Sequence, residues 1–116
     1  MDRVMQALAD QTRRDILDLL RAEALSAGDI AEHFPSISRP AVSQHLTVLR
    51  EADLVTTEKK GRHRIYRLNP IPLEDLWKNW LSRYETVWQE RLETLKQVVE
   101  TSVRNDKDTK GDRKRR

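Results

Sequence analysis

The chain has 116 residues, of which 37% are hydrophobic and 35% charged, so it is long enough for one domain and too short for two ordinary ones. No apolar run approaches the roughly 18 residues that cross a membrane, and the first residues lack the basic and apolar segments of a signal peptide. Because there is no cysteine, disulfides, zinc–thiolate sites and thiol switches are excluded, and we expect a soluble cytoplasmic protein.

The net charge of +3 is unevenly distributed. Residues 1–37 hold four basic and seven acidic side chains, whereas residues 38–68 hold seven basic and three acidic ones. Residues 105–116 add six basic and three acidic side chains. Positive charge gathered in one central and one terminal segment is typical of a protein that binds a polyanion.

Helical patterns come first in chain order. Apolar residues from Val4 to Leu8 predict a short helix over residues 2–9. Asp10 suits the N-cap of a second helix, because its carboxylate can accept from free backbone N–H groups. The apolar stripe of that second helix consists of Ile16, Leu17 and Leu20.

A third helix is predicted from the segment Ser26 to Asp29, which resembles a capping box, and Pro35 stops it. Ser38 is the expected N-cap of a fourth helix over residues 38–52, with Ile37 and Val42 positioned as a hydrophobic staple. The buried face of the fourth helix is expected to hold Val42, Leu46 and Leu49.

After the fourth helix, the spacing of apolar residues changes from the helical pattern to alternation. Residues 54–59 and 64–68 predict two strands, and residues 60–63 predict the turn between them. This basic hairpin spans residues 54–68. After Pro70 and Pro72, apolar residues predict one long helix over residues 73–103, whereas residues 105–116 have no apolar side chain and predict a disordered basic tail.

The predicted architecture is a winged helix-turn-helix, mainly α with a small β-hairpin, in the order α-α-α-α-β-β-α. We expect one domain over residues 1–104, in which residues 26–68 form the unit that reads DNA. Burying the leucines of the fourth helix turns its small, polar face outward, where it can enter a major groove. The predicted DNA-binding residues are Ser38, Arg39, Pro40, Ser43, Gln44 and Thr47 on that helix and Lys60, Arg62 and Arg64 on the hairpin. For each residue taken alone, an ordinary solvated surface is the competing interpretation.

Three segments carry a family resemblance. Residues 8–17 (LADQTRRDIL), 41–52 (AVSQHLTVLREA) and 61–68 (GRHRIYRL) resemble the opening, the recognition helix and the wing of the ArsR/SmtB family of bacterial transcriptional repressors. The resemblance covers roughly residues 3–70. It implies a homodimeric repressor, with the first and last helices at the dimer interface and an inverted-repeat operator near its own promoter.

Two positions depart from the family pattern. Gln11 stands where the family usually has proline, which a first-turn position tolerates. Asp53 stands where the family usually has glycine after the recognition helix. If Asp53 adopts the left-handed conformation that glycine favours there, it does so at some energetic cost.

Many members of this family sense metals through cysteines or through histidines of the last helix. This chain has no cysteine, and its histidines, His33, His45 and His63, lie outside the predicted last helix. His45 is more simply interpreted as a packed or backbone-bonded histidine. We predict no transition-metal site and no cofactor.

Aromatic residues gather in the predicted last helix, whose broad apolar stripe exceeds what a small winged domain can cover. We interpret this stripe, together with the first helix over residues 2–9, as a homodimer interface; a tryptophan-lined ligand pocket is the alternative. The predicted interface residues are Val4, Leu8, Trp77, Trp80, Leu81, Tyr84 and Trp88.

The sequence thus predicts a homodimeric, sequence-specific DNA-binding repressor whose partners are double-stranded DNA and a second copy of itself. The alternative is a winged-helix protein-interaction module that has lost specific DNA binding. No paired carboxylates, nucleophile–base pair or phosphate-binding loop predicts an enzyme. The sequence does not choose among small-molecule, protein and absent effectors.

Overall fold

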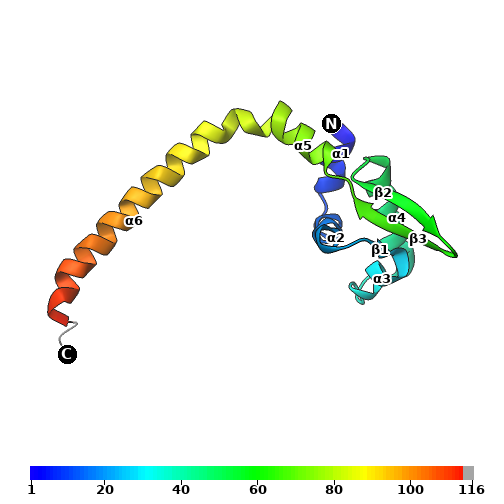
Figure 1. The fold of residues 1–116 in the computed structure, drawn as a ribbon, viewed down its shortest axis with the longest axis horizontal. Helices are drawn as coiled ribbons and strands as arrows, with labels where there is room; N and C mark the ends of the chain where they lie inside the picture. The colour runs from blue at the N-terminus through cyan, green and yellow to red at the C-terminus, as the bar shows by residue number, and fades with distance from the viewer. Residues whose placement is uncertain (114–116) are drawn as a thin grey trace. The chain divides into compact units, whose positions relative to one another are not determined.

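The computed structural model describes the backbone of residues 1–113 and the side chains of residues 1–103. Figure 1 shows the order of its helices and strands. They are α1 (Asp2–Leu8), α2 (Gln11–Ala22), β1 (Leu25–Ser26), α3 (Ala27–Glu32), α4 (Arg39–Glu51), β2 (Val55–Lys60), β3 (His63–Leu68), α5 (Ile71–Asn79), the 3₁₀ turn η1 (Leu81–Tyr84) and α6 (Glu85–Arg113). This confirms the predicted winged helix-turn-helix class.

Side-chain caps start three of the helices where the sequence predicts them. Asp10 accepts a hydrogen bond from the backbone N–H of Arg13 at 3.0 Å and begins α2. The hydroxyl of Ser26 accepts from the N–H of Asp29 at 3.1 Å and begins α3. The hydroxyl of Ser38 accepts from the N–H of Ala41 at 3.2 Å and begins α4. Each cap satisfies a backbone donor that the first turn of a helix leaves free.

The predicted hairpin is present and belongs to a sheet of three antiparallel strands in the order β1-β3-β2. Its first strand is displaced by one residue from the predicted bounds, its second begins one residue earlier than predicted, and the turn between them consists of residues 61–62. Gly61 has a φ of 61°, a conformation that glycine adopts without a Cβ penalty. The strand β1 was not predicted, because two residues show no alternation and their pairing with Tyr66 and Ile65 is distant in sequence.

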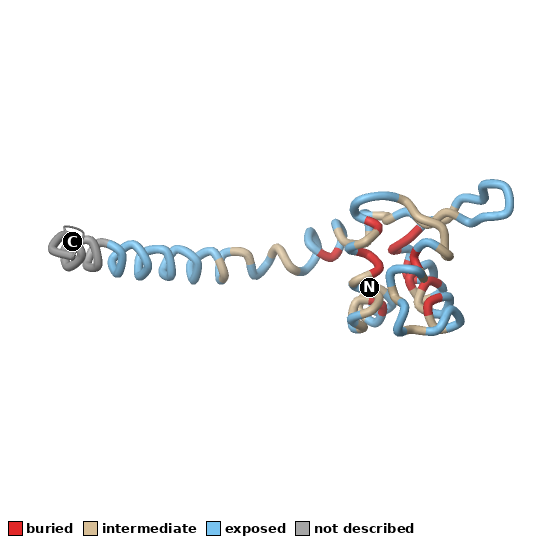
Figure 2. The backbone as a smooth tube through the Cα atoms, turned by 90° about the horizontal axis from the view of Figure 1, so that it is seen from below, coloured by how far each residue is buried: buried red, intermediate tan, exposed pale blue. Residues whose placement is uncertain are grey.

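The core is formed by residues of α2, α3, α4 and the start of the hairpin, together with Ala7 of α1. Figure 2 shows the buried segments along the backbone. The predicted apolar faces of α2 and α4 are buried there, and Ile16 and Leu49 are completely inaccessible to solvent. The predicted staple residue Ile37 packs against this core, of which Val42 is a member. The largest fully buried side chains are Ile16, Ile30, Leu46, Leu49, Leu54, Val42 and Val55.

The end of α4 has the backbone geometry of a Schellman motif. The N–H of Leu54 donates to the carbonyl of Leu49, and the N–H of Asp53 donates to the carbonyl of Arg50, both at 3.0 Å. Asp53 has a φ of 59°, so it adopts the left-handed conformation at a position that favours glycine. The chain can thereby turn directly from the recognition helix into β2.

The prediction of one continuous helix over residues 73–103 is wrong. The segment is divided into α5, η1 and α6, and Trp80 leaves helical geometry with a φ of −140° and a ψ of −63°. The hydroxyl of Ser82 donates a hydrogen bond of 3.1 Å to the carbonyl of Lys78. In a continuous helix, this carbonyl would accept from the backbone N–H of Ser82. The helix also begins earlier than predicted, at Ile71.

The chain divides into two compact units, Met1–Trp77 and Lys78–Arg116. Every buried hydrophobic residue among residues 1–103 belongs to the first unit. A single domain over residues 1–104 therefore stays a prediction, since it depends on what covers the apolar residues of the second unit.

The predicted tail at residues 105–116 lies only partly within the described chain. The backbone of α6 continues as a helix to Arg113, so residues 105–113 differ from the disordered tail that their composition predicts. Residues 114–116 lie outside the described residues. Within the described chain, no helix combines the length and hydropathy needed to span a bilayer.

Candidate nucleic-acid interface

The outward face of α4 is the centre of the candidate site. All six of its predicted DNA-binding residues are exposed: Ser38, Arg39, Pro40, Ser43, Gln44 and Thr47. On the opposite side, Val42, Leu46 and Leu49 are between 0% and 2% exposed. The predicted orientation is therefore observed, with leucines anchoring the helix and small polar groups facing solvent.

Hydrogen bonds within α4 leave part of this face available to a ligand. The hydroxyl of Thr47 donates to the carbonyl of Ser43 at 3.1 Å, so its methyl group and its oxygen lone pairs remain for outside contacts. The Ser38 oxygen accepts as a cap and retains its own O–H as a donor. Within the described part of the chain, no hydrogen bond engages the side chains of Ser43 and Gln44. Gln44 can therefore offer both a donor and an acceptor to a base edge.

Arg39 occupies the first turn of α4 beside α3. Its guanidinium Nη1 lies 3.9 Å from the position that a Cβ on Gly28 would take. Together with Ser43 it borders a hollow of about 200 Å³ between the two helices. The hollow is lined by Ala27, Gly28, Ala31, Arg39, Val42 and Ser43. A guanidinium at the positive end of a helix dipole is suited to an anionic phosphate.

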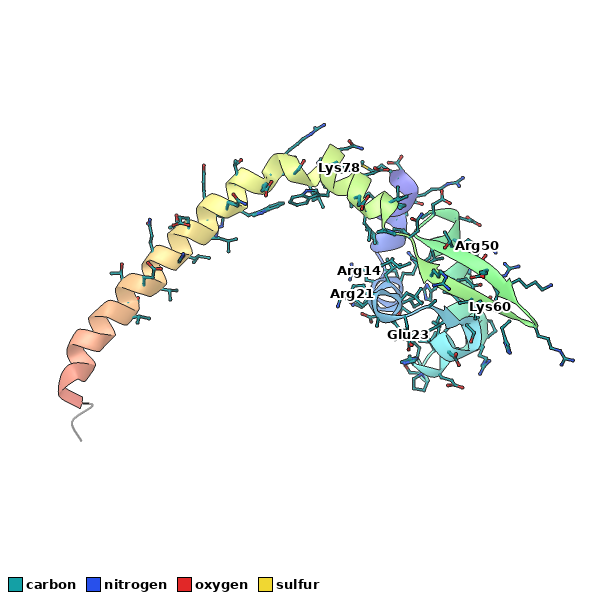
Figure 3. All side chains as sticks on the ribbon, in the orientation of Figure 1. Arg14, Arg21, Glu23, Arg50, Lys60 and Lys78 are labelled. Atoms are coloured by element: carbon teal, nitrogen blue, oxygen red, sulfur yellow. The ribbon has the colours of Figure 1, made fainter. Side chains whose placement is uncertain are left out.

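The hairpin carries the second set of predicted residues, Lys60, Arg62 and Arg64, and all three are exposed. Figure 3 shows Lys60 toward the free end of the hairpin. Lys59 lies directly opposite Arg64 in the β2–β3 register, and like charges in such a pair destabilise a sheet. An anion bound beside the hairpin would relieve this repulsion.

Ion pairing does not neutralise this end of the hairpin. Among the described residues, the only hairpin ion pair joins Arg67 to Glu58 at 3.6 Å, and both side chains are about half exposed. That pair lies nearer the core than the turn, and an exposed pair of this kind contributes at most about 1 kcal/mol. The charges of Lys60, Arg62 and Arg64 therefore remain available to a polyanion.

Sequence reasoning missed a polar cluster behind the recognition helix, formed by Asp10, Arg13 and His45. The guanidinium of Arg13 donates to the carbonyl of Ala7 through Nε at 2.8 Å and lies 3.3 Å from Nδ1 of His45 through Nη1. His45 is thus half-buried and contacts a side chain, whereas the sequence predicts a packed or backbone-bonded histidine. The local signal at Asp10 predicts a helix cap, but nothing in the sequence indicates that Arg13 reaches two other helices.

The histidines do not form a metal site in the described chain. His33 lies at the surface with Nδ1 at 2.9 Å from the carbonyl of Asp29, whereas His45 faces Arg13 and Asp10. Among the described residues, no three His, Cys, Asp or Glu side chains gather closely enough to hold an ion.

The predicted dimer residues fall in both units. Val4 and Leu8 are half-buried on α1 and pack against the core of the first unit. Trp80 and Tyr84 are exposed in the second unit, where their rings meet edge to face at 6.0 Å. The remaining predicted residues are Trp77, which is 40% exposed, and Leu81 and Trp88, which are half-buried.

The chain is similar in sequence to known transcriptional regulators. Residues 8–58 match a helix-turn-helix domain family. The transcriptional repressor SdpR of Bacillus subtilis (strain 168) is 44% identical over 84 residues, which cover 72% of this chain and 91% of that protein. The HTH-type transcriptional regulator Rv2034 of Mycobacterium tuberculosis is 42% identical over 100 residues, which cover 86% of this chain and 89% of that regulator.

A solved structure extends the likeness to three dimensions. The ArsR-like transcriptional regulator from Rhodococcus sp. RHA1 aligns with a TM-score of 0.67 at 35% identity, covering 86% of this chain and 90% of that one. The chain belongs to the ArsR family of winged helix-turn-helix transcriptional regulators.

Proposed function

We propose that this protein is a homodimeric, sequence-specific DNA-binding repressor that acts in the cytoplasm. In this proposal α4 enters the major groove, and the hairpin contacts the phosphate backbone or the minor groove. The observation that carries the proposal is the exposed face of α4, where Ser43 and Gln44 are not engaged in hydrogen bonds within the described chain. The names of the relatives, a repressor and a regulator, support the same assignment.

The proposed contacts divide into those that read sequence and those that position the protein. Gln44 and Ser43 present donors and acceptors that can pair with base edges. Arg39, Lys60 and Arg62 supply positive charge that can pair with phosphates and release counterions. The first group accounts for specificity and the second for a steep dependence of affinity on salt.

The apolar surface of the second unit supports a dimer. Between Val87 and Val103, the apolar residues of α6 are 47% to 60% exposed, apart from the half-buried Trp88. Val87 and Val98 are separated by 11 residues, as are Leu92 and Val103. An 11-residue repeat keeps apolar side chains on one side of a nearly straight helix, so the stripe suits a long apolar partner. A second copy of α6 offers such a partner.

The homodimer has a geometric consequence for the operator. A two-fold axis would present two copies of α4 to DNA at centres about 34–36 Å apart, which is one helical turn. Two such copies read an inverted repeat. We infer that the operator is an inverted repeat near the promoter of the protein's own gene, as the family resemblance implies.

A protein-interaction module without specific DNA binding is the second candidate, and the exposed apolar stripe of α6 is the observation that favours it. Competition binding separates the two. A labelled duplex from the upstream promoter is titrated with the full chain against unlabelled promoter DNA and against a scrambled duplex of equal composition. A repressor predicts that the scrambled duplex competes at least about a thousandfold more weakly, whereas equal and weak competition by both duplexes favours the interaction module.

A further inference from the structure

Arg13 joins the end of α1 to the recognition helix. Its Nη2 donates to the carbonyl of Gln6 at 2.9 Å and its Nε donates to the carbonyl of Ala7 at 2.8 Å, so the guanidinium caps the C-terminal turn of α1. The third nitrogen, Nη1, lies 3.3 Å from Nδ1 of His45 on α4. One side chain on α2 therefore contacts a helix of the predicted dimer interface and the helix that carries Gln44.

The protonation state of His45 decides whether this contact exists. A guanidinium is a donor only, so Nδ1 of His45 must be the unprotonated, accepting nitrogen. The other polar group near that nitrogen is the carboxylate of Asp10, with Oδ2 at 3.9 Å. A backbone hydrogen bond from Arg13 holds the pKa of Asp10 below its ordinary value, against partial desolvation, and the positive charges of His45 and Arg13 lower it further. Asp10 is thus an anion near neutral pH.

The other elements packed against α4 provide no competing charged partner for His45 among the described residues. Within the described chain, α1 contributes its carbonyl oxygens through Arg13, and no carboxylate of α3 or β2 pairs with His45. The exposed fraction of the His45 side chain is 21%, so a proton from solvent can reach it.

We infer that Arg13 is a positioning residue for the recognition helix and that protonation of His45 exchanges the partner of its Nδ1 from Arg13 to Asp10. When a solvent proton binds Nδ1, the Arg13 hydrogen bond loses its acceptor and the new N–H can donate to Oδ2 of Asp10. The recognition helix then loses its link to α1 and gains one to the cap of α2. Operator reading becomes sensitive to acidification, since Gln44 is the neighbour of His45 in sequence.

This inference rests on the proposed function, and its test uses the ratio of affinities for operator and scrambled duplexes. A protonated His45 adds one positive charge, which strengthens binding to both duplexes, so the ratio reports positioning separately from charge. The full chain is measured at about pH 8 and about pH 5.5, the range in which imidazole side chains change charge. We expect the wild-type ratio of operator affinity to scrambled-duplex affinity to fall about fivefold at the lower pH, because this is the usual effect of losing one hydrogen bond.

Variants identify the group that responds. In His45→Asn the amide oxygen replaces Nδ1 as an acceptor and does not titrate, so its ratio is expected to be the same at both pH values. His33→Asn and His63→Asn serve as matched controls and are expected to keep the wild-type fall. Arg13→Lys, which cannot reach all three acceptors, is expected to have the lowered ratio at both pH values.

The ring of His45 provides a readout independent of DNA. At about pH 8, nitrogen NMR of the full chain is expected to show Nδ1 unprotonated and Nε2 protonated; the opposite tautomer overturns the inference. A wild-type ratio that stays constant while specific binding persists also overturns it, as does a fall that remains in His45→Asn. A chain that shows no sequence-specific binding at either pH overturns the proposed function and this inference with it.

Discussion

The side-chain amide of Asn69 donates a hydrogen bond of 2.8 Å to the backbone carbonyl of Asp53. The backbone N–H of Asn69 also donates to the carbonyl of Leu54 at 2.9 Å. These two bonds join the residue that follows β3 to the residues that follow α4. Both ends of the hairpin are therefore fixed to the end of the recognition helix, which sets the direction of the wing relative to that helix.

Replacing Asp53 by glycine is expected to stabilise the protein. Asp53 has a φ of 59°, which brings its Cβ too close to the backbone, and glycine relieves this contact while its backbone carbonyl keeps the bond from Asn69. We expect Asp53→Gly to raise the free energy of unfolding by roughly 0.5–1 kcal/mol, measured by urea denaturation. Asp53→Ala, which retains a Cβ, is the matched control and should not gain stability. A lower unfolding free energy for Asp53→Gly would contradict the strain argument.

Truncating Gln44 tests the assignment of base reading. The side chain is exposed on α4 and carries no role in the core, so Gln44→Ala should leave the unfolding free energy within about 0.5 kcal/mol of wild type. We expect it to reduce discrimination at one base pair of each half-site by about 1–3 kcal/mol, measured with a set of singly substituted duplexes.

Arg62→Ala is the matched control for this measurement. Because Arg62 is expected to pair with a phosphate, its removal should weaken binding to all duplexes alike. The slope of log affinity against log salt concentration should become shallower by about one for each phosphate that is no longer neutralised. If Gln44→Ala instead weakened the affinity for all duplexes equally, as expected for Arg62→Ala, Gln44 would not read sequence.

The cap at Asp10 predicts a specific dependence of stability on pH. The backbone hydrogen bond from Arg13 lowers the pKa of Asp10 from its usual value of 3.8. A group whose pKa is lowered on folding stabilises the protein above its unfolded pKa and loses that contribution as the pH falls through its folded pKa. Asp10→Ala should therefore cost about 1 kcal/mol at neutral pH and progressively less below about pH 4.

The control for Asp10 is Asn, whose amide oxygen accepts the same backbone bond without titrating. Urea denaturation of the wild type and both variants across this range provides the comparison. A cost of Asp10→Ala that stays constant down to the lowest pH would show that the cap contributes independently of its charge.

Trp80→Ala tests the proposed homodimer. The ring is 37% exposed and meets Tyr84 edge to face, so it offers an aromatic surface to a partner. We expect its removal to weaken dimerisation by about tenfold or more and operator binding with it, measured by analytical ultracentrifugation and by anisotropy. Gln89→Ala, a change at an exposed polar residue of α6, should leave both unchanged. Weaker DNA binding by a persistent dimer would exclude Trp80 from the interface.

Local chemistry made much of the fold predictable. The caps Asp10, Ser26 and Ser38 satisfy backbone donors within their own first turn, so their effect can be read from neighbouring residues. The left-handed conformation of Asp53 is suggested by the family resemblance, because the family usually has glycine at this position. The exposed face of α4 followed from its buried leucines, because the helical period fixes both sides at once.

Some features could not be predicted because they depend on contacts between residues distant in sequence, or because the local sequence carries no signal for them. The strand β1 exists because Leu25 pairs with Tyr66, a partner that periodicity cannot indicate. Trp80 and Ser82 are compatible with a helix, so the local sequence carries no signal for the break between α5 and α6. The three contacts of Arg13 required the helices to be in place.

Selection of duplexes from a random pool by the full-length protein tests the central claim most directly, because it presupposes no operator. The account predicts enrichment of an inverted repeat whose half-sites are centred about one DNA turn, 10–10.5 base pairs, or a multiple of it apart. Repeating the selection with Gln44→Ala should relax the same base pair in both halves. A pool that stays random, or a single enriched half-site without symmetry, would contradict a paired recognition helix.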